Sequence, residues 1–477
     1  MEKTIRWYDH ITINIYYFAL TARSQVLTPL VVPFLVQRFM GEENKGELVG
    51  EIRLYSLMVA LLVQALMGML SDRSTSKWGK RRPFIFAGTI LESLVYIGIG
   101  LIAAKLEGPT GYWALFAAIM ISMVTSNTAH GAAQGLIPDL VPENLRGRFS
   151  GIKAFFELPA PMIFVSFVVS KMIDAGNYWA AMITLIAIVL ICMGLTMFVR
   201  ETPQEKAPYK MDWKPLLRLL LMTVMFTVVI LGAGELVKYL IGLTDNLPET
   251  TSGIVTAVIA IAGMAIAIGL GTWASVAISL GGEKKKDPSF TWWVINRLAF
   301  LVGATNLAGF AAYFIQEKFG LEGEAASGPT TMLIMFVGFA ILISSIPAGF
   351  LTDKFGKKPM IAISGIMAGV GTFIITAAPD MTLMYVGGLL IGLAMGIFFS
   401  ANWALGTELV PPEQAGRYLG LSNIAGAGAG AIGSYIGGPI GDGISFKFLI
   451  GLFGALFLIS NLALFGIKEP KKKVNSL

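Results

Sequence analysis

Cysteine, histidine and charge are all scarce in this chain. Its 477 residues include one cysteine, two histidines and only 14% charged residues. The lone Cys192 cannot form an internal disulfide, so nothing ties the protein to an oxidising compartment. The sequence also lacks a cluster of metal ligands, a nucleotide-binding motif and a Ser/His/Asp grouping. We therefore expect no metal, no cofactor and no enzymatic activity.

Apolar residues, by contrast, make up 55% of the chain. A soluble protein of this length would need far more polar surface. Apolar runs of about 20 residues, the length with which a helix crosses a bilayer, recur along almost the whole sequence. The runs are continuous rather than alternating, which predicts helices and excludes a membrane barrel. The expected class is an all-α polytopic protein embedded in the lipid bilayer.

The apolar runs predict about fourteen transmembrane helices. The N-terminal run lacks a small-residue cleavage site, so we interpret it as the first span and not as a removed signal. The predicted spans are 9–38, 52–71, 83–104, 112–137, 149–173, 178–199, 214–243, 252–281, 290–317, 330–352, 358–378, 382–406, 418–440 and 446–467.

Lysine and arginine are concentrated in alternate loops. Loops such as 72–82 and 353–358 are basic, whereas 106–111, 174–177 and 379–381 carry no Lys or Arg. The positive-inside rule then predicts a multi-pass protein of the cell (inner or plasma) membrane with both termini in the cytoplasm. Because the basic residues lie at helix ends and not on one soluble face, the net charge of +6 does not indicate a nucleic-acid partner.

The second part of the chain repeats the first. "GMLSDRSTSKWGKRRP" at 68–83 matches "GFLTDKFGKKP" at 349–359, and "PDLVPENLRGRFSG" at 138–151 matches "TELVPPEQAGRYLG" at 407–420. The matched segments keep their order and their predicted membrane side. This predicts two six-helix bundles related by a parallel duplication.

The repeat predicts four parts of the chain. They are an N-terminal bundle (1–200), a central linker with an inserted hairpin (201–288), a C-terminal bundle (289–470) and a cytoplasmic tail (471–477). Two interpretations of the two extra spans within 213–282 remain open. They form a peripheral hairpin against lipid, or they have a role in lining the substrate path or in docking a partner. We expect a monomer.

Residues 68–83 resemble the loop motif of the major facilitator superfamily, G-x-x-x-D-[RK]-x-G-[RK]-[RK]. The longer form S-D-R-S-T-S-K-W-G-K-R-R-P-F-I is similar to the glycoside–pentoside–hexuronide:cation symporters, especially their sucrose-transporter-like branch. The resemblance implies a fold of two six-helix bundles and transport of a sugar or glycoside. The inserted hairpin departs from that family, which usually has twelve spans.

A second departure concerns the coupling ion. Sodium-coupled melibiose carriers have paired acids one turn apart in the second helix, where this chain has Ala60 and Gln64. The local "VQALMG" at 63–68 is closer to the sucrose-type pattern. The resemblance therefore implies protons as the coupling ion.

Ionisable residues inside predicted spans are the first candidates for mechanism. Arg23, Glu92, Glu157 and His130 all lie within spans. An arginine at mid-span costs about 2.5–3.5 kcal/mol on insertion scales, so such residues usually have partners or face a cavity. Arg23 is expected to pair with Glu92 or Glu157, and the four residues are candidates for proton coupling. Alternatively, Arg23 forms a structural pair and His130 is a packing residue.

Amides and aromatic rings on the same helices suit a hydroxyl-rich ligand, because sugars are held by hydrogen bonds and by ring faces. The alternative for the aromatic residues is packing against lipid or the core. The candidates for the substrate cavity are Tyr16, Tyr17, Gln25, Asn127, Gln134, Asn306, Asn402 and Trp403.

Acidic and basic residues at matching helix ends in both repeats predict a cytoplasmic gate whose charge-assisted bonds form in one state and break in another. Topology alone would explain the basic residues but not the repeated aspartate. The candidates are Asp72, Arg73, Arg81, Asp139, Arg146, Arg148, Asp353, Lys357, Glu408 and Arg417.

The sequence thus favours a secondary transporter that works by alternating access, as a proton-coupled symporter of a sugar or glycoside. Two other hypotheses remain open. The fourteen spans also suit a proton-driven exporter of amphipathic drug-like or lipid compounds. A non-transporting assembly factor or sensor with the same fold is the third, although costly intramembrane charges weigh against it.

Overall fold

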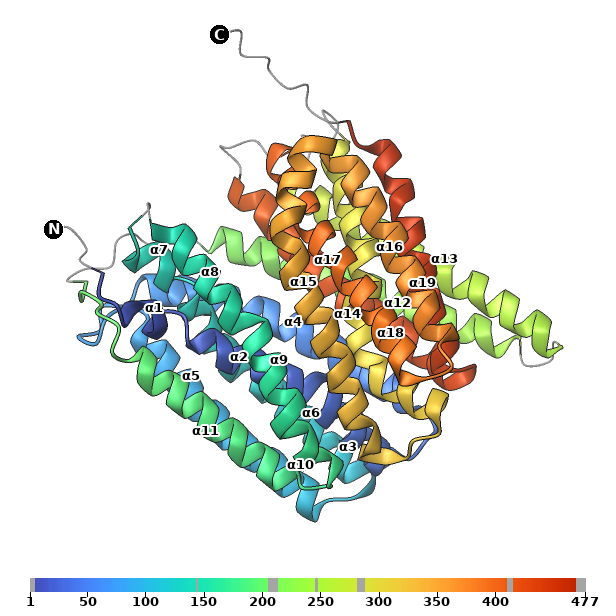
Figure 1. Ribbon diagram of the computed structural model, residues 1–477, viewed down its shortest axis with the longest axis horizontal. Coiled ribbons are helices and arrows are strands. Elements are labelled where there is room, and N and C mark those ends of the chain that lie inside the picture. Colours follow the sequence, from blue (N-terminus) through green and yellow to red (C-terminus); the bar gives the residue numbers. More distant parts are fainter. Residues whose placement is uncertain are drawn as a thin grey trace, which may run out of the picture. The chain divides into compact units, whose positions relative to one another are not determined.

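The computed structural model describes residues 5–142, 145–204, 213–244, 248–280, 288–409 and 415–468, without the side chains of 249, 250, 280 and 415–424. Every regular element in these ranges is a helix (Figure 1). The helices are α1 (Asp9–Thr12), α2 (Tyr16–Val26), α3 (Val32–Met40), α4 (Lys45–Asp72), α5 (Arg82–Lys105), α6 (Gly108–Ala133), α7 (Leu136–Leu140), α8 (Arg146–Glu157), α9 (Pro159–Phe164), α10 (Ser170–Asp174), α11 (Tyr178–Thr196), α12 (Lys214–Gly242), α13 (Glu249–Leu280), α14 (Ser289–Phe319), α15 (Ser327–Phe355), α16 (Lys357–Ala377), α17 (Met381–Leu409), α18 (Ala415–Gly443) and α19 (Phe446–Ser460).

Thirteen helical segments in the described ranges are long and apolar enough to cross a membrane. Each coincides with one of the predicted spans, and the remaining prediction, 418–440, lies within the glycine-rich helix α18. The predicted all-α polytopic membrane fold is therefore confirmed.

Two of the spans are interrupted where the sequence carries prolines. Residues 27–31 around Pro29 form a π-helical turn between α2 and α3. The fifth span breaks between α8 and α9 at Pro159 and then forms a second π-helical turn at 165–169. Proline has no N–H to donate to the carbonyl four residues earlier, so the α-helix is interrupted at such a position. A π turn is a single wider turn inserted in an α-helix.

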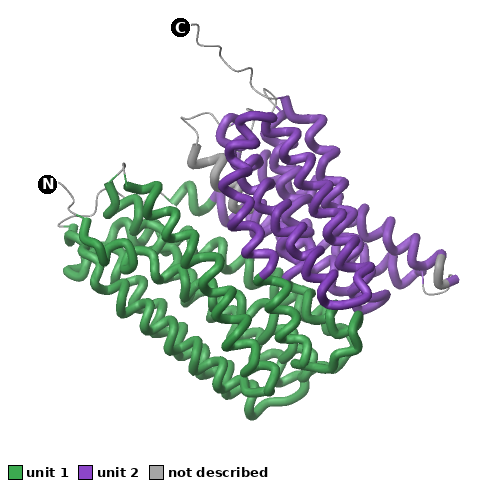
Figure 2. Tube along the Cα trace, in the orientation of Figure 1, with its two compact units in different colours: residues 1–217, 309–335 green, residues 218–308, 336–477 purple. Residues whose placement is uncertain are grey.

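Contacts group the chain into two compact units (Figure 2). Unit 1 comprises residues 1–217 and 309–335, and unit 2 comprises 218–308 and 336–477. The boundaries fall inside α12, α14 and α15, so each of these helices contributes to both units. The division predicted at 200 and 289 rests on repeated sequence segments, whereas these two units are defined by contacts between residues. The two divisions therefore need not have the same boundaries.

The segment 309–335 packs on the first helices of the chain within unit 1. The Tyr313 hydroxyl donates to the Pro33 carbonyl (2.7 Å), and the Gln316 side chain donates to Gln37 Oε1 (2.9 Å). The hydroxyl of Ser327 donates to the Ser170 carbonyl (2.9 Å). The ends of α14 and α15 are thereby held against α3 and α10.

The inserted hairpin, α12 and α13, packs within unit 2 through glycines. Phe226 of α12 is 1% exposed, and a Cβ at Gly271 of α13 would lie 2.5 Å from its ring. A Cβ at Gly428 of α18 would also overlap this ring. Small residues allow helices to approach closely, so the glycine pattern explains how the hairpin docks on α18.

Candidate functional site

A buried ion pair joins two spans of unit 1. Arg23 Nε of α2 donates to Glu92 Oε1 of α5 at 2.8 Å, and the two residues are 9% and 3% exposed. Two hydroxyl groups of α6 join this pair. Ser122 Oγ donates to Glu92 Oε1 (2.6 Å) and accepts from Arg23 Nη2 (2.8 Å), and the Thr125 hydroxyl donates to Glu92 Oε2. Of the two partners expected for Arg23, the structure selects Glu92.

The space beside this ion pair is small. A cavity of about 10 Å³ is lined by Tyr16, Arg23, Glu92 and their neighbours. About 10–15 Å³ is needed to hold one water molecule, so a sugar does not fit there. Tyr16 bonds to Thr89 (2.7 Å) and is 3% exposed, which places it as a wall of this cavity.

A second polar group in unit 1 surrounds Tyr17. The ring of His130 lies edge-on to that of Tyr17, with 6.5 Å between centroids, and Gln134 Nε2 lies 3.3 Å from His130 Nε2. Lys153 Nζ lies 4.3 Å from the Tyr17 ring centroid and 3.5 Å from Glu157 Oε2. The Glu157 side chain is 41% exposed. Tyr17, His130, Gln134 and Glu157, all predicted, thus form one connected group with Lys153, which was not predicted.

Three predicted cavity residues stand apart from these groups. Asn127 is buried and donates to the Met123 carbonyl of its own helix (2.8 Å). Asn306 is fully buried, where it donates to the Ala429 carbonyl (3.2 Å) and so joins α14 to α18. Gln25 is partly exposed.

The other two predicted cavity residues meet an unpredicted arginine in unit 2. Arg297 Nη1 of α14 donates to Asn402 Oδ1 of α17 at 2.9 Å. The guanidinium carbon lies 5.8 Å from the Trp403 ring centroid and 5.7 Å from that of Trp293. Arg297 lies inside a predicted span, which is the signal that could have identified it.

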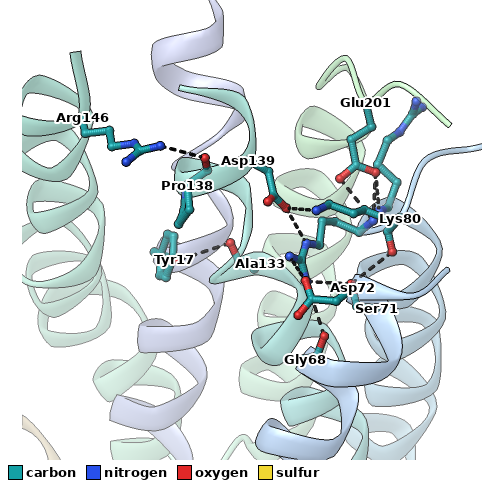
Figure 3. A network of polar contacts seen from close by, with 12 residues as sticks. Tyr17, Gly68, Ser71, Asp72, Lys80, Ala133, Pro138, Asp139, Arg146 and Glu201 are labelled. Atoms are coloured by element: carbon teal, nitrogen blue, oxygen red, sulfur yellow. Dashed lines mark hydrogen bonds and ion pairs between the residues drawn. The ribbon is translucent and has the colours of Figure 1, made fainter. Parts of the chain in front are cut away.

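The loop between α4 and α5 is tied to α7 by one arginine (Figure 3). Arg81 Nε donates to Asp139 Oδ2 (2.8 Å), while its Nη2 bonds to Asp72. Its Nη1 donates to Ser71 Oγ (3.1 Å), and Lys80 Nζ lies 2.9 Å from the same Asp139 oxygen. We call these five residues the loop network. The structure brings the predicted Asp72, Arg81 and Asp139 into direct contact.

Glu201 completes the network and was not among the predicted residues. Its carboxylate accepts from the backbone N–H of Arg81 (2.9 Å) and of Arg82 (3.2 Å), at the start of α5. A negative charge at a helix N-terminus is favourable. Gly79, at φ +102°, leaves the space that the Glu201 side chain occupies. Burial raises the pKa of Glu201, against the lowering effect of these N–H bonds and of the Arg81 charge.

The second repeat reproduces only part of this arrangement. Lys357 bonds to Glu408, as Lys80 does to Asp139. Lys358, however, donates to the Ile467 carbonyl (2.8 Å). Asp353 is exposed, without an ion pair among the described residues. The predicted Arg417 has its side chain outside the described part of the chain, and the predicted tail 471–477 lies outside it entirely.

The remaining predicted gate residues of the first repeat are Arg73, Arg146 and Arg148. Arg146 donates to the backbone carbonyls of Val141 (3.3 Å) and Pro138 (3.2 Å). Arg148 is exposed at the start of α8. Arg73 follows Asp72 directly, but Arg81 is the residue that contacts both aspartates.

The described residues contain no group of three or more His, Cys, Asp or Glu side chains that could hold a metal ion. The polar groups found are hydrogen-bonding clusters of arginine, carboxylate, amide and hydroxyl. Side chains of these types are suited to forming ion pairs and to hydrogen bonding with polar ligands.

Two curated relatives match parts of the chain. Sodium-dependent phosphate transport protein 3 of Homo sapiens is 28% identical over 135 residues, which are 27% of this chain and 30% of that protein. Myo-inositol transporter 2 of Schizosaccharomyces pombe is 27% identical over 144 residues, 29% of this chain and 25% of that protein. The chain thus matches less than a third of the length of these curated relatives.

The fold and the family extend over nearly the whole chain. The crystal structure of a D-xylose-proton symporter matches with a TM-score of 0.65 at 15% identity, over 98% of this chain and 99% of that one. The model of the Major Facilitator Superfamily matches residues 14–286 and 292–477. The chain therefore belongs to the Major Facilitator Superfamily.

Proposed function

We propose that this protein is a secondary active transporter that works by alternating access and couples proton movement to symport of a sugar or glycoside. The observation that carries the proposal is the buried Arg23–Glu92 pair, which joins two membrane spans. Family membership, the fold of a D-xylose-proton symporter and the match to an inositol transporter support the substrate class.

The geometry of the pair supports proton coupling. Ionised Glu92 accepts from Arg23, Ser122 and Thr125, so its charge is compensated. A proton on Glu92 removes the counter-charge of Arg23 and weakens the link between α2 and α5. Proton binding and helix position are then linked, and a substrate that prefers one arrangement shifts the same equilibrium.

The cavity beside the Arg23–Glu92 pair is too small for a sugar, so we place the substrate elsewhere than the proton site. The Tyr17 group and the Arg297 group contain the half-exposed side chains of Glu157 (41%) and Trp403 (47%), and each is a proposed substrate-binding group of its own unit. The loop network is the proposed cytoplasmic gate of the first bundle, with both termini in the cytoplasm.

The test uses purified protein in liposomes and labelled D-xylose, sucrose and myo-inositol. Glu92→Gln should abolish uphill accumulation driven by an imposed proton gradient and keep counterflow exchange, because exchange needs no net proton movement. A sodium gradient should not replace the proton gradient, since Ala60 and Gln64 supply no carboxylate. Glu157→Gln is the comparison variant: it alters a proposed substrate contact and is expected to change the apparent KM, but proton-driven accumulation should persist, because this carboxylate is 41% exposed and pairs with Lys153.

Removing one partner of a buried pair typically costs about 3–5 kcal/mol, so Glu92→Gln can fail for structural reasons. The double variant Arg23→Gln with Glu92→Gln keeps two neutral hydrogen-bonding groups at the site. Accumulation in a proton gradient by either variant would contradict the coupling assignment.

Export of amphipathic compounds is the second candidate, favoured by the two additional spans α12 and α13. Thermal stabilisation of the purified protein by lipophilic cations, and by none of the three sugars, would select it. Stabilisation by neither panel would favour a non-transporting assembly factor or sensor.

A further inference from the structure

A surface groove lies between the ends of two helices of unit 2, α16 and α19. Its volume is about 440 Å³, which is within the range of small-molecule sites. It is lined by Thr376 near the end of α16, by Ser445 just before α19, and by Lys447, Phe448, Gly451 and Leu452 in the first two turns of α19. None of these lining residues is acidic. In the proposed orientation, these ends of the two helices lie on the non-cytoplasmic side.

The groove forms because the two helices, which pack against each other, diverge toward these ends (Figure 1). Farther along the pair they cross closely, since a Cβ at Gly454 of α19 would lie 3.2 Å from Thr372 of α16. A Cβ at Gly369 of α16 would likewise lie 2.8 Å from Leu458. At Gly451, three residues nearer the start of α19, no neighbouring atom lies within 4 Å of such a Cβ. The floor of the groove at Gly451 is therefore accessible backbone.

The end of the groove at the start of α19 is polar and positively charged. Lys447 is exposed, and Ser445 is the N-cap of α19, where its Oγ accepts from the Phe448 N–H (3.0 Å). The hydroxyl proton of Ser445 donates to no described residue, so it is available to a ligand. A helix N-terminus carries partial positive charge and favours phosphate groups. The lysine, the hydroxyl and the helix start together match an anionic headgroup.

An apolar stripe leads from the groove toward the middle of the bilayer. Four side chains on one face of α16 are 42–52% exposed: Phe373, Val370, Ile366 and Ile363. Their spacing of three and four residues aligns them along the helix. From Phe373 to Ile363 the helix rises about 15 Å at 1.5 Å per residue, which is half of the roughly 30 Å hydrocarbon core. An acyl chain that starts at the groove therefore meets apolar surface over the depth of one leaflet.

We propose that this groove binds one anionic phospholipid, with its phosphate at Lys447 and Ser445 and one acyl chain over Gly451 and along α16. The positive charge favours an anionic lipid over a zwitterionic one. The apolar floor and stripe favour a lipid over a soluble phosphate, which would leave them uncovered. The bound lipid would join α16 and α19 where their own side chains separate. Such binding needs neither a sugar nor a proton gradient, so it goes beyond the proposed function and is tested separately.

The test uses the purified full-length protein in nanodiscs of phosphatidylglycerol or of phosphatidylcholine. After release into detergent, native mass spectrometry should show a retained phosphatidylglycerol and weaker retention of phosphatidylcholine. A second arm adds glycerol 1-phosphate, which presents the phosphate without acyl chains, to phosphatidylcholine nanodiscs. Phosphatidylglycerol should raise the melting temperature, and glycerol 1-phosphate should not.

Charge variants test the headgroup end of the groove. Lys447→Gln should weaken phosphatidylglycerol retention roughly fivefold, the contribution of one lysine near anionic lipid. Lys447→Arg should restore it. Lys105→Gln is the matched control, because Lys105 is also an exposed lysine at the proposed non-cytoplasmic end of a span, α5, and it should leave retention unchanged.

A glycine variant tests the acyl-chain end. Gly451→Leu places a side chain where the acyl chain would lie and should abolish retention. No neighbouring atom meets the added Cβ, and leucine has a higher helix propensity than glycine, so the lipid-free variant should be at least as stable as the unmutated protein. Gly98→Leu is the matched control: Gly98 of α5 also has no neighbouring atom within 4 Å of an added Cβ, and its substitution should leave retention unchanged.

Three results would overturn the inference. The first is phosphatidylglycerol retention at the unmutated level in both Lys447→Gln and Gly451→Leu. The second is equal retention of the two lipids, which marks ordinary bilayer lipid. The third is equal stabilisation by glycerol 1-phosphate, which marks a site for a soluble anion. A folding defect in a variant is recognised separately, by a lower melting temperature without lipid.

Discussion

Glu201 combines two opposing influences at one carboxyl group. The backbone N–H groups of Arg81 and Arg82 favour the ionised form, while burial disfavours it more strongly and raises the pKa. A folded-state pKa above the unfolded value means that the folded protein binds this proton more tightly. The stability that this contributes is present at low pH and is lost as pH rises through the folded pKa.

The pH dependence of stability therefore tests the environment of Glu201. The difference in thermal stability between the unmutated protein and Glu201→Gln should fall as pH rises from about 4.5, the ordinary value, through the raised pKa. Glu107→Gln, which alters an exposed loop glutamate, controls for the removal of one negative charge. A difference that stays constant or grows over this range would contradict the assigned environment. The measurement is a series of melting curves across pH.

At the scale of residues, the sequence predicted identities better than partners. Intramembrane position identified Arg23 and Glu92, but Glu92 and Glu157 were equally possible partners. The rotation of α5 and α8 about their axes decides between them, and hydropathy does not define that rotation. Arg297 was missed although it lies in a predicted span, because nothing in the sequence linked it to Asn402 and Trp403 on another helix. Glu201 was missed because it lies just beyond the end of a predicted span.

The hairpin of α12 and α13 has a polar and a glycine-based attachment to α18. Glu235 accepts from Lys238 (2.9 Å) and from the Tyr435 hydroxyl (2.7 Å). Phe226 packs where Gly271 and Gly428 leave space. Several exposed apolar side chains, among them Val228 and Val258, suit the lipid side of the same helices. The hairpin is thus a docked element of unit 2.

A methyl group at Gly428 should loosen this element. Gly428→Ala places a Cβ against the Phe226 ring, and overpacking of this kind costs about 1–3 kcal/mol. Gly426→Ala is the matched control, because no atom lies within 4 Å of the added Cβ and alanine favours a helix by about 1 kcal/mol over glycine. The midpoint of thermal unfolding should fall for the first variant and hold or rise for the second.

A second change makes this test specific. Phe226→Leu removes ring atoms that the new methyl group meets, so in the double variant the cost of Gly428→Ala should shrink. Equal cost with and without the phenylalanine would show that the two residues do not pack together.

Element positions followed from the sequence more closely than element interruptions. The predicted span 83–104 corresponds to Arg82–Lys105, because a continuous apolar run bounded by charges defines both ends. The predicted 149–173, in contrast, is divided into α8, α9, a π turn and α10. The prolines at 159 and 161 indicated a disturbance, but which carbonyls lose their bonds depends on the helices packed alongside.

For the whole molecule, hydropathy was sufficient to predict the all-α polytopic class and the thirteen spans found in the described residues, and the loop motif at 68–83 indicated the family. The hydropathy of a span is a sum over about 20 residues, so a few polar positions within it do not change the prediction. The grouping of residues 309–335 with the first bundle depends on a few specific bonds, such as Tyr313 to Pro33, and no periodicity indicates them.

The predicted orientation can be tested with single cysteines. In a Cys192→Ala background, Thr75→Cys and Ala175→Cys place thiols in two exposed loops on opposite predicted sides. Impermeant maleimide should label Ala175→Cys in intact cells and Thr75→Cys only after permeabilisation, because the basic loop 72–82 is retained in the cytoplasm. The reverse labelling pattern would invert the proposed topology.

The two copies of the loop motif are only partly alike in the contacts that the described residues make. The lysine–carboxylate pair survives in both copies, as Lys80 with Asp139 and Lys357 with Glu408. In the first copy Arg81 contacts both Asp72 and Asp139, whereas in the second copy Lys358 donates to the Ile467 carbonyl. The two copies of the predicted repeat therefore hold their basic loop residues with different partners. A substitution at Arg81 removes contacts with two carboxylates, whereas a substitution at Lys358 removes a contact with a backbone carbonyl, so equal changes in the two loops have unequal consequences.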